Sequence, residues 1–211
     1  KHDLVTATKK DSQGLCFVGK IALPTFLQQQ LAPKQGNVIE IPMDMPQFIA
    51  YANIPRDEEH VEQLAAPFEY QESDGQKVTT HQGAHYYTVG QRKGLHIGGR
   101  PEPSFVIGIN TVTNSVYSGQ TDEHPGLNRI ALKLEASTLN WIIRSEVFDA
   151  ENRLKCQMRI RYRQALQSGT LIKKNESYFI LFEDNQKGIT PGQFAAWYQD
   201  GILIGSGVIA H

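Results

Sequence analysis

The sequence predicts a mainly β protein, with an α+β central domain followed by a C-terminal antiparallel β-barrel. Beyond residue 129, short apolar runs alternate with turns and show no helical period, as expected for a small barrel. Before residue 120, strand-like runs flank one glycine-rich segment. A Gly- and Pro-containing connection at 119–128 separates the two halves, so we expect domains at 1–125 and 126–211.

Composition restricts the possible classes of protein. The chain has 211 residues with a formal net charge of −1, and no apolar run approaches the roughly 18 residues that span a bilayer. It begins at Lys1 without a methionine or an apolar leader, so we expect a piece of a longer, non-secreted protein. Cys16 and Cys156 have neither disulfide-scaffold nor zinc spacing, which predicts no metal site and a reducing, cytoplasmic setting.

The first part of the chain predicts a helix at 23–31 and a strand at 38–41. Residues 41–74 then hold eight acidic residues against one basic residue, Arg56. We expect an acidic surface insertion, with a helix from Asp57 to about Ala66 that has acids at the positive end of its dipole. Such a patch would face away from a nucleic acid, and a contact with a partner protein is the alternative.

The segment 81–99 combines five glycines, three histidines, a tyrosine pair and Arg92-Lys93, without any acidic residue. Glycines let backbone amides approach a ligand, and the cations attract an anion, so the segment predicts a phosphate-facing loop at Gln91-Arg92-Lys93. A turn-rich connector is the alternative. We place Tyr86 and Tyr87 at the end of a strand at 78–89, on opposite faces of it.

The remaining elements are all strands. A hairpin is expected at 104–120 with its turn at 113–115. The barrel strands are expected at 129–134, 141–147, 154–163, 169–172, 178–183, 193–199 and 202–209. Asp200-Gly201 favours a tight hairpin between the last two.

The expected strand 154–163 carries a basic face. Its alternation places Cys156, Met158, Ile160 and Tyr162 on one side, and Gln157, Arg159, Arg161 and Arg163 on the other. Seven basic residues and no acidic one occur between residues 153 and 174. Arginine binds phosphate oxygens bidentately, so this face predicts a phosphate contact. A merely solvated strand face is the alternative.

Cys16 lies in the short apolar run 15–18, directly after a polar turn that contains Gly14. Nearby lysines would lower the pKa of its thiol, which makes it a candidate nucleophile. A small apolar cysteine in a buried strand is the alternative.

Four ordered motifs carry a family resemblance: K-K-D-S-Q-G-L-C-F-V-G (9–19), Y-Y-T-V-G-Q-R-K-G-L-H-I-G-G (86–99), R-Y-R-Q (161–164) and P-G-Q (191–193). Together they resemble the tRNA-specific 2-thiouridylases, also known as tRNA (5-methylaminomethyl-2-thiouridylate)-methyltransferases. The resemblance implies ATP activation of the 2-carbonyl oxygen of a wobble uridine. A cysteine persulfide then supplies the sulfur of 2-thiouridine.

The resemblance also assigns residues and partners. Cys16 would carry the transferable sulfur, and Arg161, Tyr162, Arg163 and Gln193 would bind tRNA, within a barrel like those of elongation factors. ATP, with Mg²⁺, would bind an N-terminal domain that this sequence lacks, so we expect the chain alone to be inactive. A sulfur-donor protein is the other expected partner. The alternative is a non-catalytic RNA-binding barrel of translation-factor type, and no Gly-x-Gly loop supports a methyltransferase.

Overall fold

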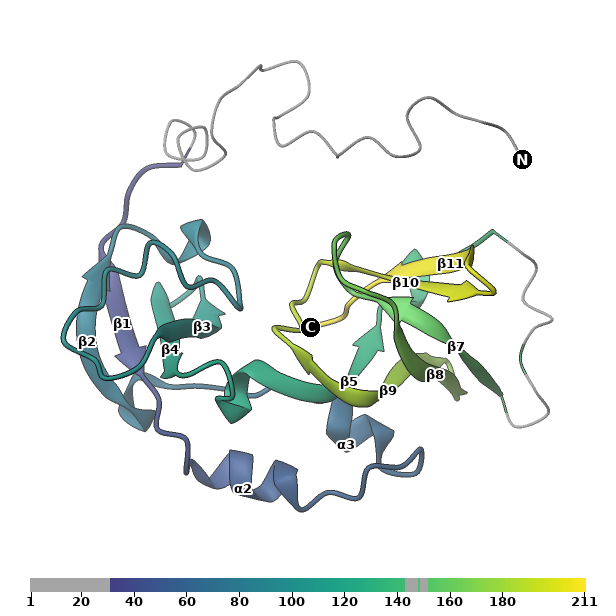
Figure 1. The fold of residues 1–211 in the computed structure, drawn as a ribbon. Coiled ribbons are helices and arrows are strands. Elements are labelled where there is room, and N and C mark those ends of the chain that lie inside the picture. The colour runs from purple at the N-terminus through teal and green to yellow at the C-terminus, as the bar shows by residue number, and fades with distance from the viewer. Residues whose placement is uncertain (1–30, 143–147, 149–151) are drawn as a thin grey trace.

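The computed structural model describes residues 31–142, 148 and 152–211 (Figure 1). Cys16 and nearly all of the expected helix 23–31 lie outside these residues. The described strands form two sheets, one of four strands in the order β2-β1-β4-β3 and one of seven in the order β5-β9-β8-β7-β10-β11-β6. The prediction of a mainly β protein is therefore confirmed.

The four-stranded sheet consists of β1 (Gly36–Glu40), β2 (Gln76–His81), β3 (Ser104–Asn110) and β4 (Ser115–Gln120). β1 pairs antiparallel with β2 and parallel with β4. The β3–β4 hairpin forms where the sequence predicts it, with Asn114 in a left-handed conformation at its turn (φ 56°).

The expected strand 78–89 is wrong in its second half. β2 ends at His81, because Gly83 adopts a φ of 150° and leads into a 3₁₀ turn, η2 (Ala84–Tyr86). Tyr86 and Tyr87 therefore do not alternate across a strand. Tyr86 instead lies against the ring of His85, and Tyr87 against that of His81.

The seven-stranded sheet closes into a barrel. Its strands are β5 (Asn128–Leu134), β6 (Asn140–Trp141), β7 (Arg153–Arg159), β8 (Gln167–Lys174), β9 (Ser177–Lys187), β10 (Phe194–Gln199) and β11 (Ile202–Val208). Leu134 bridges to Ile209, and Glu135 N donates to Val208 O at 2.9 Å, which joins the end of β5 to the end of β11. Asp200 and Gly201 both have positive φ, as the predicted tight hairpin requires.

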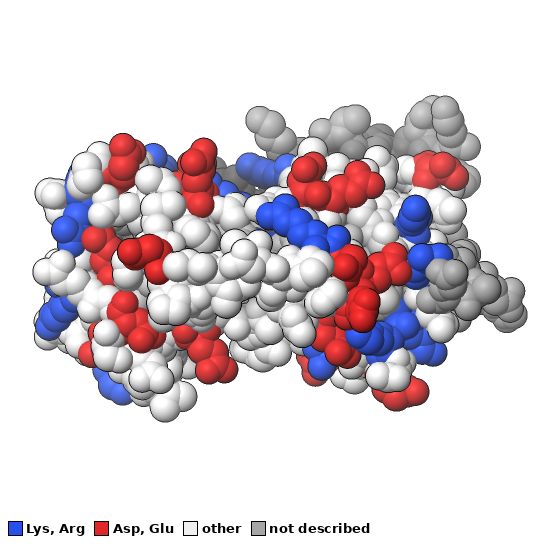
Figure 2. Space-filling model, turned by 90° about the horizontal axis from the view of Figure 1, so that it is seen from below, with Lys and Arg blue, Asp and Glu red and all other residues white. Residues whose placement is uncertain are grey.

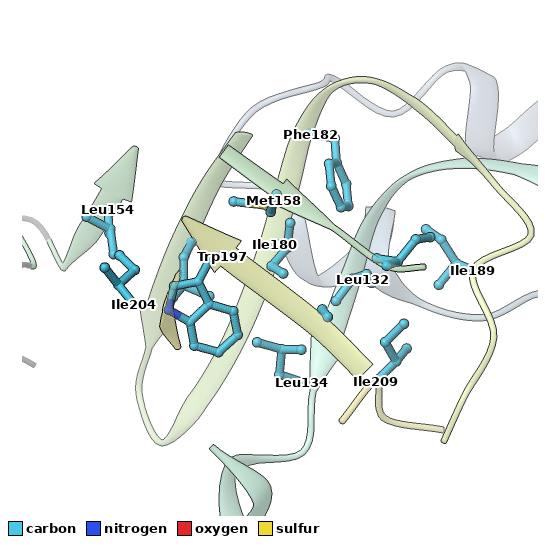
Figure 3. Close-up of a cluster of buried hydrophobic side chains, with 13 residues drawn as sticks. Leu132, Leu134, Leu154, Met158, Ile180, Phe182, Ile189, Trp197, Ile204 and Ile209 are labelled. Carbon is cyan, nitrogen blue, oxygen red and sulfur yellow. The ribbon is translucent and has the colours of Figure 1, made fainter. Parts of the chain in front are cut away.

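The barrel core is built around Trp197, which is fully buried (Figure 3). A Cβ on Gly205 would come within 2.6 Å of the indole Nε1, so only glycine lets the ring lie against β11. Other large side chains of this core are Leu132, Leu134, Met158, Ile180, Phe182, Ile204 and Ile209. The core fixes β7 and β10, which carry two of the predicted site motifs at their ends.

The expected strand 154–163 is too long, because β7 ends at Arg159. Gln164 Oε1 accepts a hydrogen bond from Ile160 N at 3.0 Å, and Gln164 N donates to Arg161 O at 3.1 Å. These local bonds replace the sheet ladder and turn the chain. Tyr162 therefore leaves the apolar face that alternation assigned to it and is 63% exposed.

Two short helices connect the sheets: α2 (Pro46–Ala52), which the sequence analysis missed, and α3 (Val61–Ala65). α3 begins four residues later than expected, since Asp57 Oδ1 accepts a hydrogen bond from His60 N at 3.0 Å and holds the preceding turn. The described chain also contains the 3₁₀ turns η1 (Glu72–Asp74), η3 (Pro125–Leu127) and η4 (Ala136–Thr138). Among the residues described, no helix is both long and apolar enough to cross a membrane.

The acidic segment packs against the barrel. Val61, Leu64 and Ala65 of α3 share a buried cluster with Ile130, Ala131, Ile172 and Phe179 of β5, β8 and β9. Tyr51 Oη donates to Leu64 O at 3.2 Å and accepts from Ile130 N at 3.0 Å. The predicted boundary after residue 125 stays a prediction, and helices from before it cover strands from after it (Figure 1).

Candidate nucleic-acid interface

The glycine-rich loop is fixed by one amide side chain. Gln91 Oε1 accepts from Thr88 N at 3.2 Å, and Gln91 Nε2 donates to Lys93 O at 2.7 Å. The loop is tied to β3 by Val106, whose backbone bonds both Gly90 N and Gln91 O. Because both ends of its amide are used within the loop, Gln91 holds the loop in shape.

Arg92 and Lys93 occupy the tip of this loop, and both are exposed. Gly90 and Gly94 on either side have φ values of 88° and 89°, which side chains rarely adopt. Neither cation forms an ion pair with a residue that the structure describes. Their charges are therefore available to an anion in solution.

Arg161 lies in the barrel where it approaches the glycine-rich loop of the other sheet. Its Nη2 donates to Gly188 O at 2.7 Å, and a Cβ on Gly90 would come within 3.1 Å of the same nitrogen. Partial burial there lowers the pKa of the Arg161 guanidinium, which stays charged at neutral pH. The turn 160–164 of the barrel thus lies beside the glycine-rich loop of the other sheet.

Tyr162 and Arg163 project from this turn into solvent. Their neighbour Arg159 is fully occupied: Nη2 and Nε donate to Tyr198 Oη at 2.7 and 3.1 Å, and Nη1 donates to Tyr162 O at 3.0 Å. Arg159 therefore shapes the turn. Both arginines of R-Y-R-Q, Arg161 and Arg163, are exposed, and Arg161 is the one that donates to Gly188 O.

Gln193 precedes β10, and its backbone bonds Ile209 and Thr190. Its Oε1 is buried and has no hydrogen-bond partner among the described residues. The side chain is half-buried. A hydrogen-bond donor of a bound nucleic acid would have to come close to the barrel surface to reach this oxygen.

The basic stretch 153–174 does not form one free face. Arg153 pairs with Glu58 at 3.5 Å, and Lys174 pairs with Glu62 at 3.6 Å, so two of its cations face the acidic segment. Figure 2 shows acidic and basic side chains side by side over the barrel on the face that carries α2 and α3. Two of the seven cations are therefore paired, while Arg161 and Arg163 of the predicted basic face stay exposed, and its phosphate contact stays a prediction.

Comparisons with known proteins give the family. Residues 132–209 match the aminomethyltransferase beta-barrel domain model, and residues 59–120 match the tRNA methyl transferase PRC-barrel domain model. The whole chain is 46% identical over 211 residues to the tRNA-specific 2-thiouridylase MnmA of Christiangramia forsetii. The chain belongs to the tRNA-specific 2-thiouridylase family. Its MnmA relative in Flavobacterium johnsoniae is 43% identical over 99% of the chain, and that in Halalkalibacterium halodurans is 37% identical, also over 99%.

The chain spans about half the length of the 2-thiouridylases it matches, covering 53% of the first two relatives and 46% of the third. Two of the four motifs that the family resemblance rests on fall on neighbouring parts of the structure. The segment 86–99 forms the glycine-rich loop, and the segment 161–164 forms the turn beside it.

Of the chain's two cysteines, Cys16 lies outside the described residues, so its role stays a prediction. Cys156 on β7 packs against the barrel core. Burial raises the pKa of its thiol to about 12, which leaves almost no thiolate at neutral pH. Cys156 is therefore partly buried against the barrel core, on the side that the alternation predicts.

Sequence reasoning missed Arg129, which is 8% exposed at the start of β5. Its Nη1 donates to Ala65 O at 3.1 Å and to Ala66 O at 3.0 Å, and this satisfies carbonyls at the end of α3. The only sign of this buried arginine in the sequence is its position, a single charge directly before the apolar run 130–132. Only the three-dimensional packing of α3 reveals what that charge contacts.

Proposed function

We propose that this chain is the tRNA-binding part of a tRNA 2-thiouridylase. The proposed tRNA surface consists of the loop tip, Arg92 and Lys93, and the barrel turn, Tyr162 and Arg163. These four residues together are called the loop–turn surface. Gln91 and Arg161 hold the two halves of this surface in position, and Gln193 contributes at the barrel side.

One observation carries the proposal: Arg161 contacts both the Gly90 backbone and the Gly188 carbonyl. The exposed cations Arg92 and Lys93 of the glycine-rich loop therefore lie on a loop that adjoins the barrel turn, which carries Arg163. A polyanion with phosphates several ångströms apart can contact both loops at once. Tyr162, 63% exposed beside them, offers a ring on which an unpaired base can stack.

Charge supports this surface over the rest of the basic stretch. Arg153 and Lys174 are paired with carboxylates, whereas Arg92, Lys93 and Arg163 have no such partner in the part of the chain described. To bind Arg153 or Lys174, a phosphate has to displace a carboxylate. To bind one of the three unpaired cations, it displaces only water.

The sulfur chemistry rests on the family resemblance. In the proposal, Cys16 carries the sulfur as a persulfide that a sulfur-donor protein supplies, and the acceptor is a uridine of tRNA. The glycine-rich segment does not fit the phosphate loop of an ATP site, because the glycines between 83 and 99 do not lead into an α-helix whose N-terminus could hold phosphates.

Site-specific photocrosslinking tests the surface. Lys93→p-benzoylphenylalanine and Arg163→p-benzoylphenylalanine should each crosslink to tRNA on irradiation, and the same replacement at Lys174 should not. Crosslinks from Lys174 alone, or equally from all three positions, would show that tRNA binds elsewhere.

The cysteine is tested in the full-length protein. Cys16→Ser should abolish thiolation of tRNA and leave tRNA binding unchanged. Retained thiolation would favour a non-catalytic RNA-binding barrel, the alternative that the sequence left open.

A further inference from the structure

A cavity of about 670 Å³ lies between the two sheets. Tyr87, Val89 and Ile107 line it from the four-stranded sheet and its loop, and Ile189 and Thr190 line it from the barrel. Cavities of about 300 to 1,000 Å³ lined mostly by apolar groups are the usual size of small-molecule sites. The loop–turn surface lies outside this lining.

Arg129 also lines the cavity. Its Nη1 is used by the carbonyls of Ala65 and Ala66, but its Nε and Nη2 make no hydrogen bond to any described residue. It also forms no ion pair within the described ranges, although the residue is only 8% exposed. Buried arginines are normally paired with an anion, and the Nε–Nη2 edge is the one that binds carboxylate or phosphate bidentately.

A second polar group in the lining also has no partner. His85 Nε2 is buried and makes no hydrogen bond with the residues described. The rings of Phe68 and Tyr87 belong to the same lining. Glu69 is its acidic member, and it is exposed and forms no ion pair with Arg129.

We propose that this cavity binds a small organic anion in which a phosphate or carboxylate is joined to a flat ring, the chemistry of a nucleoside monophosphate. The anion accepts hydrogen bonds from Arg129 Nε and Nη2, and His85 adds a polar contact. The ring lies against the aromatic and aliphatic walls. The site does not depend on the proposed function, since it would stand if the loop–turn surface bound no RNA.

Titration of the chain with uridine 5′-monophosphate, followed by amide NMR shifts, tests the site. Shifts should appear at Val89, Ile107 and Thr190. Uridine and inorganic phosphate, at the same ionic strength, should each bind about tenfold or more weakly, because each lacks half of the recognised chemistry. Arg129→Gln should weaken nucleotide binding by about 10- to 100-fold.

A second variant keeps the test decisive if Arg129→Gln unfolds the end of α3. Thr111 is an exposed member of the lining, so Thr111→Trp should narrow the mouth and weaken binding without lowering the melting temperature. A uridine trinucleotide shows whether the natural ligand is part of an RNA or a free nucleotide. If it competes with the monophosphate, the ligand is a nucleotide of RNA; if it does not compete, the ligand is a free nucleotide. Absence of shifts at the cavity amides, or unchanged binding in both variants, would overturn the site.

Discussion

Arg161 donates a hydrogen bond from Nη2 to the carbonyl of Gly188 at 2.7 Å, within the barrel and beside Gly90 of the glycine-rich loop. Gly188 has a φ of 65°, and a Cβ placed on it would clash with that same nitrogen. The glycine is therefore required twice, once for its backbone conformation and once to admit the guanidinium. The same guanidinium lies beside Gly90 of the glycine-rich loop, so the two halves of the loop–turn surface adjoin.

Gly188→Ala should separate these two requirements. Positive φ at alanine costs about 1–2 kcal/mol, and the clash displaces Arg161, so tRNA affinity should fall by roughly threefold to tenfold. Gly201→Ala is the matched control, because Gly201 has a φ of 76° and open space around its Cβ position. Gly188→Ala should lose at least as much stability as Gly201→Ala in thermal unfolding, and a tRNA affinity that is equal in the two would contradict the role of Arg161.

Tyr51→Phe should destabilise the junction between α3 and the barrel. Removal of the hydroxyl leaves Ile130 N and Leu64 O without their partner, at a cost of about 1–3 kcal/mol in the free energy of unfolding. Urea denaturation measures the change. Tyr162→Phe, whose hydroxyl is exposed, should stay within about 0.5 kcal/mol of the parent. Equal stability of the two variants would show that α3 is not held by Tyr51.

His124 should make the fold sensitive to acid. It is fully buried, its Nδ1 accepts from Gly126 N at 3.1 Å, and its Nε2 lies 3.1 Å from Ile41 O, so the neutral ring donates through Nε2. Burial lowers the pKa of this ring below its ordinary value of 6.5. Above pH 6.5 the ring is neutral in both the folded and the unfolded chain, and the protein keeps its full stability. As the pH falls below 6.5, the unfolded chain binds a proton at His124 that the folded chain does not bind, so the free energy of unfolding decreases.

Chemical denaturation between pH 5 and pH 7 measures this effect. A single such histidine contributes a slope of up to about 1.4 kcal/mol per pH unit. His124→Gln should reduce the slope and leave the part that comes from His81, whose pKa burial also lowers. A variant that retains the whole slope would show that His124 does not titrate on unfolding.

Alkylation should distinguish the two cysteines. With a pKa of about 12, Cys156 in the folded protein should react with iodoacetamide at pH 8 at least about a hundredfold more slowly than a free cysteine. The label should therefore appear on Cys16, and Cys16→Ser protein should react only after unfolding in guanidinium. Rapid labelling of folded Cys16→Ser protein would contradict the burial of Cys156.

The sequence predicted the elements that depend on neighbouring residues. The hairpin at 104–120 and the tight turn at Asp200-Gly201 formed as expected, because turn chemistry is local. The β7 strand was predicted too long, since alternation in residues 154–163 continues through a turn that the Gln164 side chain imposes. Charge and glycine content predicted a phosphate-facing loop at residues 91–93; Arg92 and Lys93 are exposed there, and the phosphate contact stays a prediction.

Relationships between distant segments could not be predicted. Nothing near Arg161 in the sequence indicates that it meets Gly90 and Gly188, and nothing near Glu62 indicates that it meets Lys174. Both contacts arise because the two sheets and α3 pack together. The number of charged residues follows from the sequence, whereas which of them form ion pairs depends on the three-dimensional packing.

The salt dependence of tRNA binding tests the central claim most directly. The combined variant Arg92→Ala, Lys93→Ala, Arg163→Ala should flatten the plot of log affinity against log salt by about two units, at roughly 0.7 to 0.9 for each phosphate that is no longer neutralised. Lys174→Ala, which removes a cation already paired with Glu62, should leave the slope unchanged. A folded triple variant with the parent's slope would contradict binding of tRNA at the loop–turn surface.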